Sequence, residues 1–138
     1  MSTRSYVGRK LDNGKIKYIY CHFDGYPDSL GVVLYDHYNT KEKIDELLSF
    51  GDASSIHERL HPTDPAHHNI DGDREEGVCC FYGRDRGEKG VDAKTADTLD
   101  DLTNDWCISY VYVWDDGKWL VQGGKQQDWT PLQEVLNK

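Results

Sequence analysis

The 138-residue sequence lacks any apolar run long enough to span a membrane, and no basic segment followed by an apolar one opens it. It has one methionine and three phenylalanines but nine tyrosines, so most of its aromatic rings carry a polar group. Charged residues make up 30% and hydrophobic residues 37% of the chain. These features predict one soluble domain over residues 1–138, located in the cytoplasm and without a membrane partner.

The sequence also lacks the short motifs that identify many enzymes and cofactor sites. It has no glycine-rich phosphate-binding loop, no nucleophile elbow and no paired-cysteine zinc motif. Two of its four cysteines are neighbours, and three lie in strand-like runs, so the pattern does not fit a disulfide framework. We therefore expect reduced thiols and no cofactor.

The net charge of −9 is unevenly distributed along the chain. Residues 1–20 hold five basic residues against one acidic residue, a net charge of +4, which leaves −13 for the remainder. The acidic balance disfavours general nucleic-acid binding, although the basic N-terminal region could hold a local anion site. An acidic protein that mimics nucleic acid is a further hypothesis, and it requires carboxylates spaced along one face.

Hydrophobic periodicity predicts an α+β fold, with an antiparallel sheet of about five strands and helices packed mainly on one face. Asn13-Gly14 between two strand-like runs predicts a hairpin, and Asn39 or Thr40 is expected to cap a helix that stops at Gly51. We expect strands at 5–10, 16–23, 78–82, 107–114 and 119–122, and helices at 29–38, before Gly51, at 98–104 and from 130 onward. Residues 52–56 predict a short strand or loop, and residues 57–77 a long polar loop.

The segment KYIYCHFDGYP, residues 17–27, predicts a strand followed by a tight turn. Alternation should direct Ile19, Cys21 and Phe23 toward the core beneath the helices. The opposite face then carries Tyr18, Tyr20 and His22, and the turn adds Asp24 and Tyr26. Tyr110, Tyr112 and Trp114 share one face of another predicted strand, and we expect them to adjoin Tyr18 and Tyr20. This aromatic face could bind a partner, or a helix or loop could cover it.

An anion site is a second possibility, at Tyr82, Arg84 and Arg86. If the strand at 78–82 continued, these three side chains would point the same way, and the two guanidinium groups could hold a phosphate or carboxylate. The alternative, that both arginines pair with surface acids, is favoured because such exposed pairs are common.

Catalysis and metal binding have weaker support in the sequence. Cys21 and His22 are neighbours on a strand and point to opposite faces, which favours a core cysteine beside a surface histidine. His22 and Asp24 share a face and could form a base and its orienting carboxylate. His57 and His61 lie four residues apart and could ligate zinc if helical, but prolines interrupt the segment and no metal is expected.

Three segments, RSYVGRKLDNGKIKYIYCHFDGYPD, HYNTKEKIDELLSFGDASSI and FYGRDRGE, resemble a family of small uncharacterised proteins encoded by phages and prophages, chiefly of Gram-positive bacteria. CHFDGYP is the most specific part of the match. The resemblance implies an accessory protein that acts in the cytoplasm of a bacterial host. Proteins of that sort often block a host factor or sequester a small molecule.

The residues and the resemblance together predict a protein that binds a host protein or an anionic small molecule through the aromatic face of its sheet. A second copy of the chain is another partner that this face could take. The alternative function is a small hydrolase that uses His22 and Asp24 on a phosphorylated or nucleotide substrate. The predicted binding residues are Tyr18, Tyr20, His22, Tyr26, Tyr82, Arg84 and Arg86.

Overall fold

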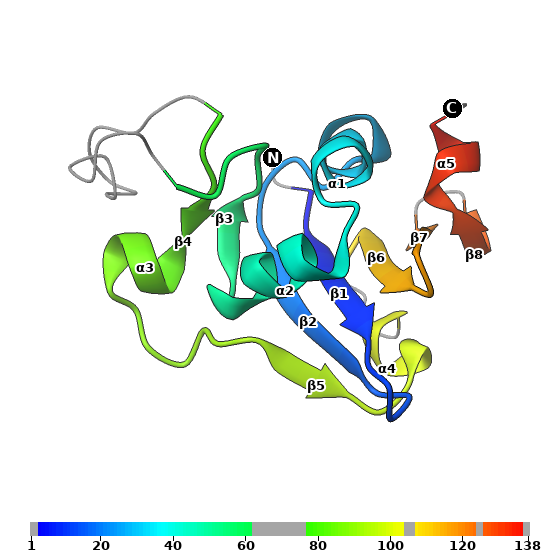
Figure 1. Ribbon diagram of the computed structural model, residues 1–138, viewed down its shortest axis with the longest axis horizontal. Helices are drawn as coiled ribbons and strands as arrows, with labels where there is room; N and C mark the ends of the chain where they lie inside the picture. Colours follow the sequence, from blue (N-terminus) through cyan, green and yellow to red (C-terminus); the bar gives the residue numbers. More distant parts are fainter. Residues whose placement is uncertain (1–2, 62–76, 104–106, 124–125, 137–138) are drawn as a thin grey trace.

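The computed structural model describes residues 3–61, 77–103, 107–123 and 126–136. Its centre is an eight-stranded mixed sheet with the order β4-β3-β2-β1-β6-β7-β8, in which β5 also pairs with β2 (Figure 1). The strands are β1 Ser5–Lys10, β2 Ile16–Cys21, β3 Ala53–Ser55, β4 Cys80–Phe81, β5 Lys94–Ala96, β6 Tyr110–Asp115, β7 Lys118–Gly123 and β8 Gln126–Pro131. The helices are the π-helical turn η1 Pro27–Gly31, and α1 Val32–His37, α2 Lys41–Ser49, α3 Tyr82–Arg86, α4 Leu99–Thr103 and α5 Leu132–Val135.

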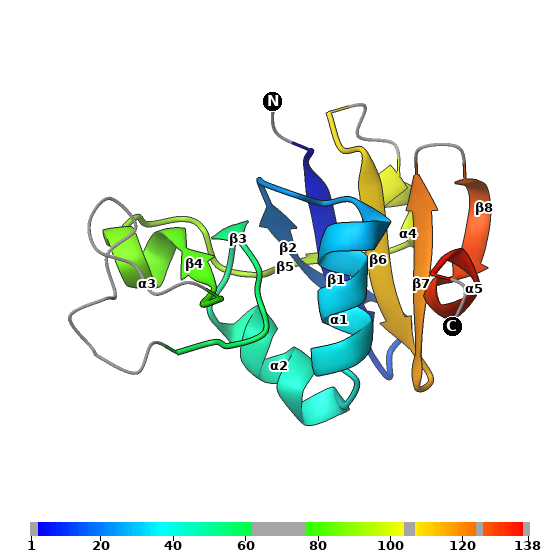
Figure 2. The same ribbon diagram turned by 90° about the horizontal axis from the view of Figure 1, so that it is seen from above.

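The α+β class is confirmed, but the predicted five-stranded antiparallel sheet with helices mainly on one face is wrong. The central strand β1 pairs antiparallel with β2 and parallel with β6, so the sheet is mixed. Helices α1 and α2 pack on one face, and α4 packs on the other (Figure 2). No helix within the described part of the chain has the length and apolar character needed to cross a membrane.

Local sequence features explain the elements that were predicted correctly. The β1–β2 hairpin turns through Asn13 and Gly14, where the Asn13 side chain accepts a bond from the Lys15 backbone and Gly14 has a φ of 86°. Helix α2 begins after Thr40, whose hydroxyl accepts a bond from the Lys43 backbone N–H. Its buried residues, Ile44, Leu47 and Leu48, form the predicted apolar stripe.

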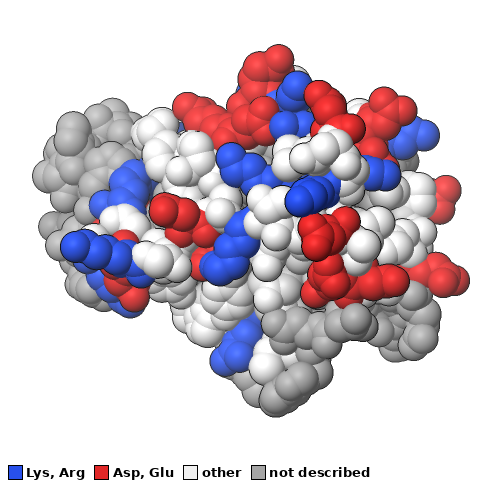
Figure 3. All heavy atoms as spheres, turned by 90° about the horizontal axis from the view of Figure 1, so that it is seen from below, with Lys and Arg blue, Asp and Glu red and all other residues white. Residues whose placement is uncertain are grey.

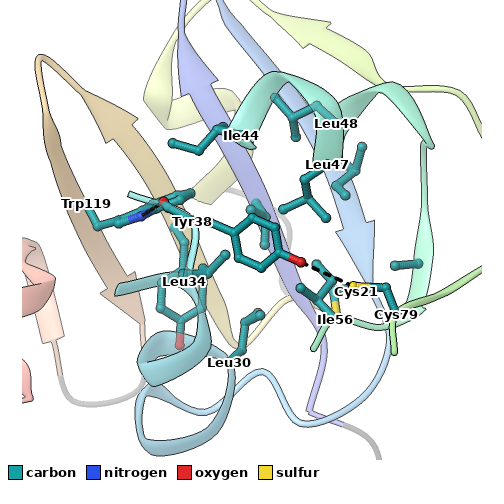
Figure 4. Packing of buried hydrophobic residues seen from close by; sticks show 14 of the residues in the cluster. Cys21, Leu30, Leu34, Tyr38, Ile44, Leu47, Leu48, Ile56, Cys79 and Trp119 are labelled. Atoms are coloured by element: carbon teal, nitrogen blue, oxygen red, sulfur yellow. Dashed lines mark hydrogen bonds between the residues drawn. The ribbon is translucent and has the colours of Figure 1, made fainter. Parts of the chain in front are cut away.

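The main core lies between the sheet and helices α1 and α2 (Figure 4). Tyr38, at the end of α1, is at its centre: its carbonyl accepts a bond from the Trp119 indole N–H, and its hydroxyl donates to the His57 carbonyl. The same hydroxyl lies 3.5 Å from the Cys79 sulfur. Ile19 and Cys21 are fully buried in this core, as the alternation of β2 predicts.

A second, smaller core lies on the opposite face of the sheet. Its buried members are Ile16, Ala96, Leu102, Val111 and Val113. Tyr6 and Tyr18 pack against it from the sheet, and Leu99 packs against it from α4. This part of the tyrosine face is therefore covered by other elements of the protein, which is the second of the two alternatives that the sequence left open.

Two predictions about side-chain placement are wrong. Tyr112 lies opposite Val7 in the β1–β6 register and is buried beneath the helices, so the Tyr110–Tyr112–Trp114 face points away from Tyr18 and Tyr20. Phe23 is 44% exposed instead of buried, because β2 ends at Cys21 and the backbone then turns. The predicted loop at 57–77 is described only at 57–61 and 77, and residues 62–76 lie outside the described residues.

Candidate functional site

A chain of aromatic rings runs along β1 and β2 on the face opposite α1 and α2. Ring centroids are 4.9 Å apart for Tyr18 and Tyr6, 6.5 Å for Tyr6 and Tyr20, 5.8 Å for Tyr20 and His22, and 4.5 Å for His22 and Phe23. We call these five residues the aromatic row. Strand alternation and the β1–β2 register place Tyr6, Tyr18 and Tyr20 on one face. The row is covered at its Tyr18 end and open at Phe23.

The central contact of the row joins Tyr20 to His22. The Tyr20 hydroxyl oxygen lies 2.5 Å from His22 Nδ1. Burial raises the pKa of Tyr20, and burial together with the nearby Arg4 charge lowers the pKa of His22 below its ordinary value of 6.5. Both side chains are therefore neutral at pH 7. With the Tyr20 hydroxyl as donor, the imidazole proton is on Nε2, and Nδ1 is already occupied.

Arg4 is the cation that shifts the pKa of both members of this pair. Arg4 directly precedes β1. The β1–β2 register, continued one residue beyond the Ser5–Cys21 pair, places Arg4 opposite His22, and strand alternation places it on the same face as Tyr6 and Tyr20. Its side chain is exposed, and within the described ranges the structure gives its guanidinium group no hydrogen bond or ion pair. The positive charge of Arg4 lowers the pKa of both Tyr20 and His22.

Tyr82, at the start of α3, also acts on the pKa of Tyr20. Burial raises its pKa, and a hydrogen bond with the Ser54 side chain opposes that rise. Arg86, one turn further along α3, places its guanidinium carbon 5.5 Å from the centre of the Tyr82 ring. Arg86 also lies 3.5 Å from Glu88, so its charge is shared with an acidic neighbour.

Arg84 does not face this site. Residues 82–86 form helix α3, so the continued strand that would give Tyr82, Arg84 and Arg86 a common direction is absent, and helical spacing separates Arg84 from the other two. Its guanidinium group donates to the Asp85 carboxylate and to the carbonyls of Leu60 and Cys79. It also stacks on Phe81, at 4.9 Å from the ring centre. Through these contacts Arg84 binds α3 to the core, and its guanidinium group is not available to a ligand.

The turn at residues 22–26 carries the exposed aromatic side chains. Phe23 and Tyr26 are 44% and 45% exposed, the large apolar residues most open to solvent in the described structure. Asp24 between them has a φ of 56°, a left-handed conformation that is uncommon for a residue other than glycine. At Gly25 a Cβ atom would lie 2.7 Å from the Thr3 carbonyl oxygen, so only glycine fits there.

Hydrogen bonds to four different parts of the protein fix this turn. The Phe23 N–H donates to Ser54, and the Gly25 N–H donates to Thr3. The buried Tyr112 hydroxyl donates to the Gly25 carbonyl at 2.7 Å, and the Leu30 N–H donates to the Asp24 carbonyl. The two exposed rings are thus attached to a fixed backbone.

Beyond Tyr26 lies a shallow groove of about 540 Å³. Its lining consists of Tyr26, Pro27, Asp28, Val32, Tyr110, Val135 and Leu136.

The groups proposed for catalysis are not arranged for it. Cys21 is fully buried, its thiol donates to the Phe23 carbonyl, and burial raises its pKa to about 12, so it is not a nucleophile at neutral pH. No hydrogen bond joins the Asp24 side chain to His22 in the described part of the chain. His22 is oriented by Tyr20 instead, and a neutral phenol does not stabilise an imidazolium as a carboxylate does.

The predicted metal ligands are also apart from the site. His57 bonds through its backbone to Cys79, and His61 packs edge-on against Phe50, with its Nε2 3.8 Å from Glu46. The described part of this segment is not helical, so the two imidazoles do not share a helix face. Among the described residues, no group of three or more His, Cys, Asp and Glu side chains could hold a metal ion.

Sequence analysis missed three features of the molecule. Arg4 was counted only in the basic N-terminal region, although its alternation with Tyr6 already places both on one face of β1. Tyr6 was not included in the aromatic face. Nothing in the sequence indicated the pocket of about 290 Å³ between α1 and the β6–β7 hairpin, where Tyr35, Trp114 and Trp119 supply the aromatic lining.

Charge is mixed on the face of the molecule that Figure 3 shows. Lys and Arg side chains alternate there with Asp and Glu side chains instead of forming a field of one sign. A chain of nucleic-acid phosphates needs a continuous basic track, which this face does not offer. Comparison of the chain with protein-family models, curated proteins and solved structures gives no match.

Proposed function

We propose that this protein acts by binding, and that its contact surface consists of the turn at residues 22–26 and the open end of the aromatic row. The proposal rests on the exposure of the Phe23 and Tyr26 rings, which lie on a backbone fixed by hydrogen bonds to the Ser54 and Thr3 carbonyls and from the Tyr112 hydroxyl. Exposed aromatic rings are the side chains that most often supply the binding energy of an interface.

The conformation of the turn supports this proposal. A left-handed Asp24 costs free energy that an unconstrained surface turn would avoid, and such residues cluster at functional sites. The fixed backbone also reduces the entropy lost on association, because the rings need little further ordering. Both features are expected of a contact surface.

We propose a protein of the bacterial host as the partner, acting in the cytoplasm. The resemblance to phage and prophage accessory proteins supports this choice, since such proteins often block a host factor. The hydrolase alternative is not favoured, because Cys21 is buried and His22 is paired with Tyr20 instead of a carboxylate. Arg84 is not part of the proposed contact surface, because it bonds to Asp85 and to two backbone carbonyls. Arg4 is part of it, because its charge acts on Tyr20 and His22.

The experiment is affinity capture of partners from a bacterial lysate on the immobilised protein. Phe23→Ser and Tyr26→Ser should each weaken capture about tenfold, which corresponds to about 1.4 kcal/mol. The matched control is Leu11→Ser, which also removes an apolar side chain but lies in the β1–β2 turn at the other end of the sheet. Equal capture by all three variants and the wild type would rule out the proposed surface.

A further inference from the structure

The corner where the aromatic row meets the turn at residues 22–26 combines a cation, a ring N–H and an open ring. The cation is Arg4, which has no counter-ion among the residues that the structure describes. The ring N–H is Nε2 of His22, in the tautomer in which the Tyr20 hydroxyl donates to Nδ1. The open ring is Phe23, which meets His22 edge-on at 81° with centroids 4.5 Å apart.

The polar groups of this corner favour an anion with several oxygen atoms. A guanidinium group presents its donors as a planar fork that matches two oxygens of a phosphate, and the His22 N–H adds a third donor on the same face. Asp52, an acid whose charge acts on Tyr20, is already engaged, because its carboxylate accepts from the Tyr20 N–H at 2.9 Å and lies 3.6 Å from Lys94. Asp24, on the exposed turn, makes no bond to His22.

The Phe23 ring favours a ligand with a flat aromatic part. Its edge-on contact with His22 leaves a ring face uncovered, in agreement with its 44% exposure. A nucleobase of any kind can stack on such a ring. A ligand with a phosphate and an aromatic base would therefore use the cation, the N–H donor and the ring together.

We propose that Arg4, His22 and Phe23 form a site for a single nucleoside phosphate, with the phosphate on Arg4 and His22 Nε2 and the base against Phe23. The inference rests on the proposed binding surface and names a ligand class for its open end. A single nucleotide fits better than a nucleic-acid chain, because the protein carries a net charge of −9 and positive and negative side chains are interspersed on the face that Figure 3 shows.

The test is a titration of the purified full-length protein with adenosine 5′-monophosphate, followed by calorimetry and by NMR of the His22 ring. Adenosine and inorganic phosphate are the two part-ligand probes. We expect the monophosphate to bind at least about tenfold more tightly than either part. Equal binding of inorganic phosphate would remove the base from the proposal, and binding of phosphotyrosine but not of the nucleotide would overturn it.

Variants separate a specific site from general electrostatic attraction. Arg4→Gln should weaken binding of the monophosphate about tenfold, and Phe23→Leu should weaken the monophosphate without changing inorganic phosphate. Lys118→Gln makes the same charge change on β7, away from this corner, and should leave binding unchanged. Equal weakening by Arg4→Gln and Lys118→Gln would overturn the site.

Failure of this inference is distinguishable from failure of the proposed function. If the nucleotide does not bind but Phe23→Ser still abolishes capture of a host protein, the contact surface stands and the nucleotide site does not. The NMR spectrum of each variant also shows whether it is folded, so loss of binding is not confused with loss of structure.

Discussion

The Tyr112 hydroxyl donates a buried hydrogen bond of 2.7 Å to the carbonyl of Gly25, a residue 87 positions away in the chain. The bond links strand β6 to the turn that carries Phe23 and Tyr26. It explains why a tyrosine rather than a phenylalanine occupies a fully buried position of the main core. The core thus fixes the proposed contact surface directly.

Tyr112→Phe is expected to destabilise the protein by about 1–3 kcal/mol, because it leaves the buried Gly25 carbonyl without a partner while preserving the ring. Urea unfolding followed by tryptophan fluorescence measures the change. Tyr110→Phe is the matched control, since the Tyr110 hydroxyl has no hydrogen bond in the described structure. A change for Tyr112→Phe no larger than that for Tyr110→Phe would contradict the assigned role of the bond.

The four cysteines should differ strongly in reactivity. Cys21, Cys79 and Cys80 are buried, whereas Cys107 is partly exposed, and all four are free thiols. With a pKa of about 12, only about one Cys21 thiol in 10⁵ is ionised at pH 7. Native protein treated with iodoacetamide should therefore be alkylated first at Cys107, and unfolded protein at all four sites, as mass spectrometry of the peptides can show. Early labelling of Cys21 would contradict its burial.

The local patterns predicted much of the fold, because they depend on short-range physics. The Asn13-Gly14 turn, the Thr40 cap and the β2 alternation each involve residues close in sequence. The parallel pairing of β1 with β6 joins residues more than 100 positions apart, and no local pattern specifies it. That pairing puts Tyr112 opposite Val7, beneath the helices, and so separates it from Tyr18 and Tyr20.

The candidate site was predicted in part for the same reason. Alternation correctly placed Tyr18 and Tyr20 on one face, but it did not indicate that the second core covers the Tyr18 end. The strand expected at 78–82 ends at Phe81, and the chain is helical from Tyr82. The Asp85 carboxylate accepts a bond from the Phe81 N–H at 2.7 Å, and Gly87 ends the helix with a φ of 75°.

Arg84 and Arg86 should therefore behave differently when substituted. Arg84 and Asp85 are 15% and 3% exposed, so Arg84→Gln leaves a buried carboxylate without its cation and should cost about 3 kcal/mol of unfolding free energy. Arg86→Gln removes an exposed pair with Glu88 and a cation–π contact with the Tyr82 ring, and should cost at most about 1 kcal/mol. Chemical denaturation of both variants measures these costs, and similar values for the two would refute the structural role of Arg84.

The pKa of His22 gives the most direct test of its surroundings. Burial and the Arg4 charge both disfavour the imidazolium, so His22 in the folded protein should titrate below 6.5, as followed by NMR of its ring protons. Because the unfolded chain takes up this proton at higher pH than the folded one, the His22 contribution to stability falls as the pH drops below 6.5.

Arg4→Gln should raise the pKa of His22, whereas Lys118→Gln should not change it. A bound nucleotide phosphate should also raise it, since an anion beside Nε2 favours the charged ring. A pKa at or above 6.5 in the wild type would contradict the burial of His22 as well as the nearby Arg4 charge, and an unchanged pKa in Arg4→Gln would mean that Arg4 does not face His22.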